Sequence, residues 1–227
     1  MMFDISKSVG CTERMNYLKR GFLFYMCSSC MLLVQFAIYL VNSNYWESLN
    51  FVGGFYYLMA ALGQAFLFNL IPWVILYIPF TWWRQMQKVG TILFSCAIFL
   101  LNVLAYLNGI VFQLYKFHIN GFVLDLAFGG GGNQVFVFNN TLILHGVLIG
   151  LLILLFTLAV VFIAYRYAWY VTSKQVKIGI YLFLFSCIAP QLTHAYAAAA
   201  NVNSIMEVSA CLPQYYPLTA NRLMLKL

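Results

Sequence analysis

Five long apolar runs constrain this chain more than any other feature of its sequence. They cover about residues 21–42, 52–80, 90–114, 141–164 and 178–199. An α-helix needs about 20 apolar residues to cross a bilayer, and the runs lack the alternation of apolar and polar residues that barrel strands show. The sequence therefore predicts an all-α membrane protein with five transmembrane helices.

The composition excludes a soluble globular protein. Of the 227 residues 64% are hydrophobic and only 7% are charged, whereas about 25% are charged in a soluble domain. The net charge of +7 could indicate nucleic-acid binding, but the twelve Lys and Arg residues are scattered between the apolar runs. We expect no nucleic-acid partner, one membrane domain over residues 1–200, and the start of a basic linker over 201–227.

Lysine and arginine residues are unevenly divided between the connections. Nine lie in the amino-terminal tail and in the loops after the second and fourth runs: Lys7, Arg14, Lys19, Arg20, Arg84, Lys88, Arg166, Lys174 and Lys177. The opposite connections hold only Lys116, Arg222 and Lys226. Because cytoplasmic loops carry an excess of basic residues, this distribution predicts a cytoplasmic amino terminus and an extracytoplasmic carboxyl terminus.

The second run is longer than one span needs, and it contains Pro72 and Pro79. Proline lacks the backbone N–H that a helix interior uses, and its ring clashes with the preceding turn. The sequence therefore predicts that this helix kinks or ends near these two residues.

Two segments on the outer side are more than turns. Residues 116–126 have apolar side chains at near-helical spacing, which predicts a short helix on the membrane surface with Lys116, His118 and Asn120 as its polar residues. In the terminal segment, Thr219 is a candidate helix cap. Arg222 and Lys226 then lie four residues apart on one helical face, which forms a small basic surface near the membrane.

The residues that enzymes use are sparse. The three histidines, His118, His145 and His194, all lie toward the outer side, but no carboxylates accompany them at the spacing of a metal site. Asp125 and Glu207 are single acids without a partner at fixed spacing, and no nucleophile motif is present. We expect interfacial histidines with satisfied hydrogen bonds, and no catalytic centre, cofactor or metal.

Polar side chains inside the apolar runs have two possible roles. They are either interhelical hydrogen-bonding groups or the lining of a substrate path, and six residues qualify: Gln35, Gln64, Asn69, Asn102, Asn108 and Gln191. Among the cysteines, only Cys211 is expected to face an oxidising compartment, while Cys27 and Cys30 are interpreted as interior packing.

Two stretches of the sequence resemble a known family. Residues 109–120, GIVFQLYKFHIN, are similar to the VF…RFHLHLN stretch after the third span of the YejM/PbgA inner-membrane proteins of Gram-negative bacteria. Residues 212–222, LPQYYPLTANR, are similar to the LPLSYPMTARR stretch of the same family. The resemblance extends to the number of spans, the loop lengths and the orientation.

The resemblance implies a regulator in the bacterial inner membrane rather than an enzyme. In that family the spans precede a periplasmic linker and a sulfatase-like or phosphoethanolamine-transferase-like domain, which is absent from this chain. The membrane domain is implied to bind the adaptor LapB and so to restrain degradation of the deacetylase LpxC by the protease FtsH. Lipopolysaccharide at the outer face releases that restraint.

The resemblance also implies a site for lipid A. The family's lipid-binding stretch has threonine, alanine and two arginines, and the matching residues are Thr219, Ala220, Asn221 and Arg222. Asn221 replaces the first arginine and removes a charge and a bidentate donor, for which Lys226 partly compensates. Anionic phospholipid, including cardiolipin, is a further expected partner.

Two alternative functions stay open at this point. One is the membrane anchor of an alkaline-phosphatase-superfamily enzyme that hydrolyses or transfers lipid headgroups, with its catalytic domain absent from this chain. The other is a cardiolipin-binding or cardiolipin-transport protein, which requires a continuous polar path through Gln35, Gln64, Asn69 and Asn102.

Overall fold

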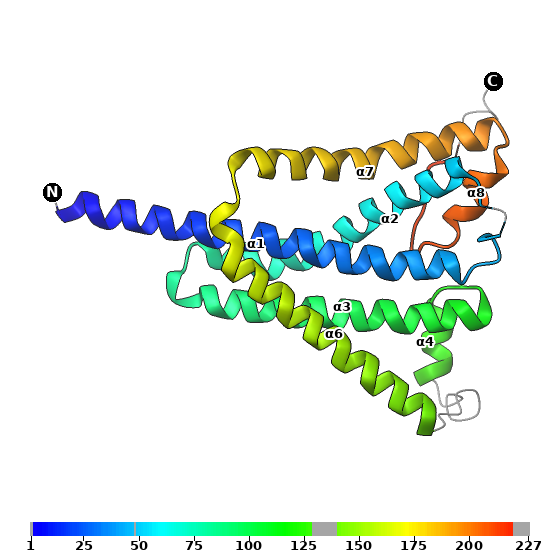
Figure 1. Ribbon diagram of the computed structural model, residues 1–227, viewed down its shortest axis with the longest axis horizontal. Coiled ribbons are helices and arrows are strands. Elements are labelled where there is room, and N and C mark those ends of the chain that lie inside the picture. The colour runs from blue at the N-terminus through cyan, green and yellow to red at the C-terminus, as the bar shows by residue number, and fades with distance from the viewer. Residues whose placement is uncertain (1, 48, 129–139, 220–227) are drawn as a thin grey trace.

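Five long helices that alternate in direction make up most of the chain (Figure 1). The computed structural model describes residues 2–47, 49–128 and 140–219, and this part contains no strand. The long helices are α1 (Met2–Val41), α2 (Phe51–Pro72), α3 (Gln87–Tyr115), α6 (Asn140–Tyr167) and α7 (Ser173–Ala199). Five helical segments are long and apolar enough to cross a membrane, which confirms the predicted all-α fold and its five spans.

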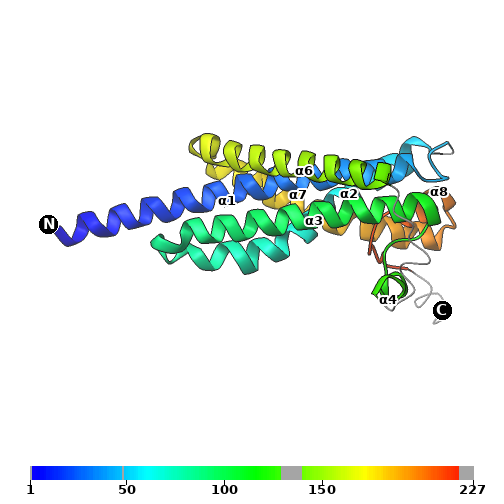
Figure 2. The same ribbon diagram turned by 90° about the horizontal axis from the view of Figure 1, so that it is seen from below.

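The alternation gives the bundle two different ends. Arg84, Arg166 and Lys174 lie at the end where α3 and α7 begin, which we call the basic end. The opposite end carries the short helices α4 (Gly121–Phe128) and α8 (Asn203–Ser209), as the turned view also shows (Figure 2). The orientation of the two ends in a membrane stays a prediction.

The first helix begins earlier than the hydropathy predicts. α1 starts at Met2, whereas the first apolar run starts at residue 21. Tyr17 is buried and Lys19 and Arg20 are half-buried, so this polar part of α1 packs against the rest of the basic end. Hydropathy marks the part of a helix that can lie in lipid and misses the polar turns that continue it.

The prolines of the second span act as predicted. α2 ends at Pro72, and the chain continues as a π-helical segment, η1 (Trp73–Tyr77), and a 3₁₀ segment, η2 (Ile78–Thr81). Pro79 lies in the first turn of η2, where its missing N–H leaves no helical hydrogen bond unmade.

The surface helix between the third and fourth spans is present but starts later than predicted. Lys116 has a left-handed backbone conformation with φ of 59° and ends α3. The Asn120 side-chain oxygen then accepts a hydrogen bond from the Val123 N–H at 3.2 Å, and α4 begins at Gly121. Lys116, His118 and Asn120 therefore lie in the connection before the helix.

Two buried clusters form the core. The cluster at the basic end joins α1 and α3 to η1 and α6, with Phe24, Tyr77, Phe94 and Val160 among its members. The cluster at the other end joins α1, α2, α3, α7 and α8. α2 also packs closely on α7, because a Cβ atom on Gly63 would collide with the backbone carbonyl of Ser186.

Candidate functional site at the strap

The segment after α7 folds back onto the bundle. Residues 201–227 were interpreted from the sequence as the start of a linker, and the structure has the helix α8 within them. Ile205 and Val208 of α8, and Cys211 and Leu212 beyond it, are all buried in the core cluster with α2. We call residues 210–219 the strap.

The strap reaches deep along the second helix. The Gln64 side-chain amide donates to the backbone carbonyl of Pro213 at 3.2 Å and lies 3.4 Å from that of Gln214. At 1.5 Å per residue, Gln64 lies about 20 Å along α2 from its cap at Asn50. Non-helical backbone at membrane depth is tolerated only where protein groups satisfy its hydrogen bonds. Gln64 therefore donates the hydrogen bonds that satisfy backbone carbonyls of the strap.

The strap then crosses to the seventh helix. The Leu218 N–H donates to the Gln191 side-chain oxygen at 2.8 Å, and the Leu218 carbonyl accepts from His194 Nδ1 at 3.0 Å. The second ring nitrogen of His194 lies 3.4 Å from the Ser209 hydroxyl. His194 thus joins α7 to both α8 and the strap.

His118 fixes the start of the strap to the third helix. Asn108 Oδ1 accepts from the Ile119 N–H at 2.7 Å, so Asn108 Nδ2 donates to His118 Nδ1 at 2.9 Å. His118 Nε2 is then the protonated nitrogen, and it donates to the Ala210 carbonyl at 3.2 Å. Burial lowers the pKa of His118, which favours this neutral form. The ring also stacks on Phe112, with centroids 4.6 Å apart.

The remaining predicted residues of the surface segment hold the chain in place. The Lys116 ammonium group donates to the Asn42 carbonyl at 2.9 Å and so ties the end of α3 to the end of α1. Asn120 caps α4 through the contact described above. In this structure Lys116, His118 and Asn120 thus connect elements of the protein to one another.

Of the predicted lipid-binding residues, Thr219 lies within the described part of the chain, at the end of the strap. Thr219 is exposed and directly follows Leu218, which α7 holds. Ala220, Asn221, Arg222 and Lys226, together with the predicted terminal helix, lie outside the described residues. The described chain therefore ends one residue beyond the contact of Leu218 with α7.

The polar residues inside the spans fall into separate sets. The Gln35 amide donates to Asn102 at 2.7 Å between α1 and α3, and the Asn69 amide donates to Ser29 at 3.0 Å between α2 and α1. Gln64 instead binds the strap. In the described part of the chain, no hydrogen bond joins these sets to one another.

Cys211 is more enclosed than the sequence suggests. Its side chain is fully buried beside Leu212 in the core cluster, and it forms no disulfide. Burial raises the pKa of the thiol, although Ser43 and Lys116 act in the opposite direction.

Over the described ranges, no group of three or more His, Cys, Asp or Glu side chains could hold a metal ion.

Three polar residues have roles that differ from the predicted ones. Gln64, Asn108 and Gln191 were assigned to helix pairing or to a substrate path, but each binds backbone that leaves the helices. The two prolines of the strap offered one signal. Pro213 and Pro217 exclude regular structure at a point where the chain still has apolar residues to bury.

Comparison with known proteins gives one result that covers the chain. No curated protein matches it. A family model described as "Domain of unknown function (DUF3413)" matches residues 12–227, which includes all five spans, α8 and the strap. The chain belongs to the DUF3413 family.

Proposed function

We propose that this chain is an inner-membrane regulator that senses lipopolysaccharide through the segment at the end of the strap. Lipid A would bind Thr219, Ala220, Asn221, Arg222 and Lys226. The bound state would change the contact of the spans with a LapB-like adaptor and so set the rate at which FtsH degrades LpxC. The resemblance of residues 109–120 and 212–222 to the YejM/PbgA proteins supports this proposal.

The observation that carries the proposal is the connection of the strap to three spans. His118 and Asn108 link it to α3, Gln64 links it to α2, and Gln191 and His194 link it to α7. A ligand that displaces residues 219–226 pulls on Leu218 first. Because the contacts are directional hydrogen bonds to backbone, they form in one position of the strap and are lost in another.

The chemistry of the ligand fits the residues beyond the strap. Lipid A carries phosphate groups, and arginine and lysine bind phosphate through charge-assisted hydrogen bonds. Such bonds contribute about 1.5–3 kcal/mol each. Transmission to the adaptor would use the population shift of a two-state element, here the strap bound to or released from the spans.

The proposal is tested in a Gram-negative cell depleted of its own relative. Residues 1–227 are expressed there, and LpxC is followed by immunoblot. We expect the chain to restore LpxC and growth. Arg222→Ala weakens the response to lipopolysaccharide, so the restraint on degradation persists and LpxC rises above the level seen with the unchanged chain.

Lys88→Ala is the matched control, because it removes one exposed charge at the basic end, far from the strap. It should leave the LpxC level as it is with the unchanged chain. If LpxC stays low while the unchanged chain is folded and present in the membrane, the regulatory function is wrong for this chain.

A further inference from the structure

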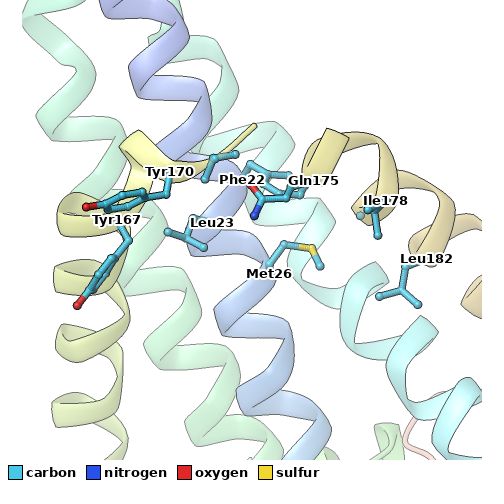
Figure 3. A pocket seen from close by; sticks show the side chains of 10 residues that line it. Phe22, Leu23, Met26, Tyr167, Tyr170, Gln175, Ile178 and Leu182 are labelled. Atoms are coloured by element: carbon cyan, nitrogen blue, oxygen red, sulfur yellow. The ribbon is translucent and has the colours of Figure 1, made fainter. Parts of the chain in front are cut away.

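A separate cavity lies between α1 and α7 at the basic end of the bundle, away from the strap (Figure 3). Its volume is about 340 Å³, at the small end of the roughly 300–1,000 Å³ range of ligand pockets. The walls are almost entirely apolar, with Phe22, Leu23 and Met26 on one side and Ile178, Gly179 and Leu182 on the other.

The packing of the seventh helix explains why the cavity is open. α7 packs along α2 and α8, whereas the connection from α6 reaches α1 through η4 (Ala168–Tyr170). The first turns of α7 therefore pack loosely against α1. Their close contact with α1 is at Gly179, where a Cβ atom would lie 2.6 Å from the Phe22 ring.

One end of the cavity is polar. The Gln175 side-chain oxygen caps α7 by accepting from the Thr172 N–H at 2.8 Å. Its amide nitrogen turns toward the cavity, while Met26 and Leu182 lie at the apolar end (Figure 3). Within the described chain no protein acceptor was found for this nitrogen, so it is free to donate to a ligand.

Five basic residues lie close in sequence to the residues that line the cavity. They are Lys19, Arg20, Arg166, Lys174 and Lys177. Residues 14–46 and 126–206, which supply every residue of the cavity wall, contain no Asp or Glu. Arg20 lies over the Tyr165 ring at 4.9 Å, which holds one of these charges close to the junction of α1 and α6.

We propose that this cavity binds one acyl chain of an anionic glycerophospholipid from the leaflet at the basic end. The chain would lie along Leu23, Met26 and Leu182, and the Gln175 amide would donate to an ester oxygen. The phosphate would then lie among the exposed Lys174 and Lys177 side chains. An acyl chain fits an apolar slot that opens to lipid, and the positive rim selects an anionic headgroup over a zwitterionic one.

The test uses the full chain in detergent and native mass spectrometry. Phosphatidylglycerol or phosphatidylcholine with the same acyl chains is added, and the retained lipid is counted. We expect several-fold more phosphatidylglycerol than phosphatidylcholine to be retained. Ile178→Trp fills the cavity and should lower retention several-fold, whereas Ile180→Trp, on an equally exposed residue of α7 outside the cavity, should not.

A second pair of variants separates a site from general attraction. Lys174→Gln should lower the preference for phosphatidylglycerol, and Lys88→Gln, which removes a charge at the same end on α3, should leave it unchanged. Equal retention of the two lipids would overturn the proposal. Equal losses in either pair of variants would overturn it as well, by showing nonspecific attraction only. These outcomes are independent of the LpxC level that tests the strap.

Discussion

The two ends of the bundle hold their irregular segments through different numbers of elements. At the strap end, Gln64 of α2, Gln191 and His194 of α7, and His118 after α3 bind backbone groups of residues 210–218. At the basic end, Tyr17 and Tyr77 stack with ring centroids 4.2 Å apart, and each hydroxyl donates to the backbone carbonyl of the other residue, at 3.2 and 2.9 Å. The bonds of the strap connect one segment to several elements, whereas those of the two tyrosines connect α1 to η1. The strap end is therefore suited to a two-state response that reaches several spans, and the basic end to a fixed scaffold.

Separation of α2 from α7 should have the largest effect, because the strap rests on both helices. Gly63→Leu places a side chain against the Ser186 carbonyl, and backbone cannot move aside cheaply. We expect a loss of about 3 kcal/mol or more in stability, seen as loss of monodisperse protein in size-exclusion chromatography. Gly150→Leu is the control, since a Cβ atom there has no neighbour within 4 Å. Equal loss in both variants would show that the close helix contact is not the cause.

Removal of the Gln64 amide should release the strap while the spans stay folded. Gln64→Leu leaves the Pro213 and Gln214 carbonyls without this partner at membrane depth. The expected cost is about 1–3 kcal/mol, measured as faster hydrogen exchange of residues 203–218. Gln113→Leu, on an exposed residue of α3 at the same end, should leave the exchange of the strap unchanged. Slow exchange of residues 203–218 in both variants would show that Gln64 does not hold the strap.

Low pH should weaken the contacts of the strap but not those of the basic end. Because burial lowers the pKa of His118, the folded state favours the neutral ring. Stability is therefore full above the ordinary histidine pKa of about 6.5 and falls as the pH drops from there through the lowered pKa of the folded state. Protonation of Nδ1 also opposes the Asn108 amide. Hydrogen exchange of residues 210–212 should rise between pH 7.5 and pH 5 after correction for the intrinsic rate.

His118→Gln should remove most of that pH dependence, because the titrating ring is gone. Lys116 and Cys211 lie beside the His118 ring, and the Tyr39 ring lies 5.9 Å away. An unchanged pH dependence in the variant would assign the effect to another group.

The smallest effect is expected from the ion pair at the basic end. Arg84 and Glu13 are 2.7 Å apart, but the Arg84 side chain is 73% exposed. An exposed pair contributes less than about 1 kcal/mol, so Glu13→Gln should shift the thermal midpoint only slightly. A large shift would show that this ion pair contributes more to stability than an exposed pair normally does.

Hydropathy and proline chemistry predicted the main features of the fold. The five spans and the end of α2 at Pro72 follow from local composition. The start of α4 was predicted too early, because the left-handed conformation of Lys116 depends on how α3 ends. α8 has only seven residues, and its stability comes from burial of Ile205 and Val208 against helices far away in sequence.

The candidate site was predictable only in part. His118 and His194 were expected to have satisfied hydrogen bonds, and both have backbone partners. The partners themselves could not be predicted, because they belong to a strap whose path depends on tertiary packing. Gln64 illustrates this limit: its polarity within an apolar run is visible in the sequence, but the carbonyls that it serves lie in Pro213 and Gln214.

The most direct test of the central claim is hydrogen exchange of the strap with and without lipid A. The full chain is placed in nanodiscs, and residues 203–218 are followed by mass spectrometry alongside the Arg222→Ala variant. We predict that lipid A changes the exchange of the strap and of the adjoining parts of α2 and α7, and that Arg222→Ala abolishes this change. Binding of lipid A with unchanged exchange of the strap would contradict the claim that the strap carries the signal to the spans.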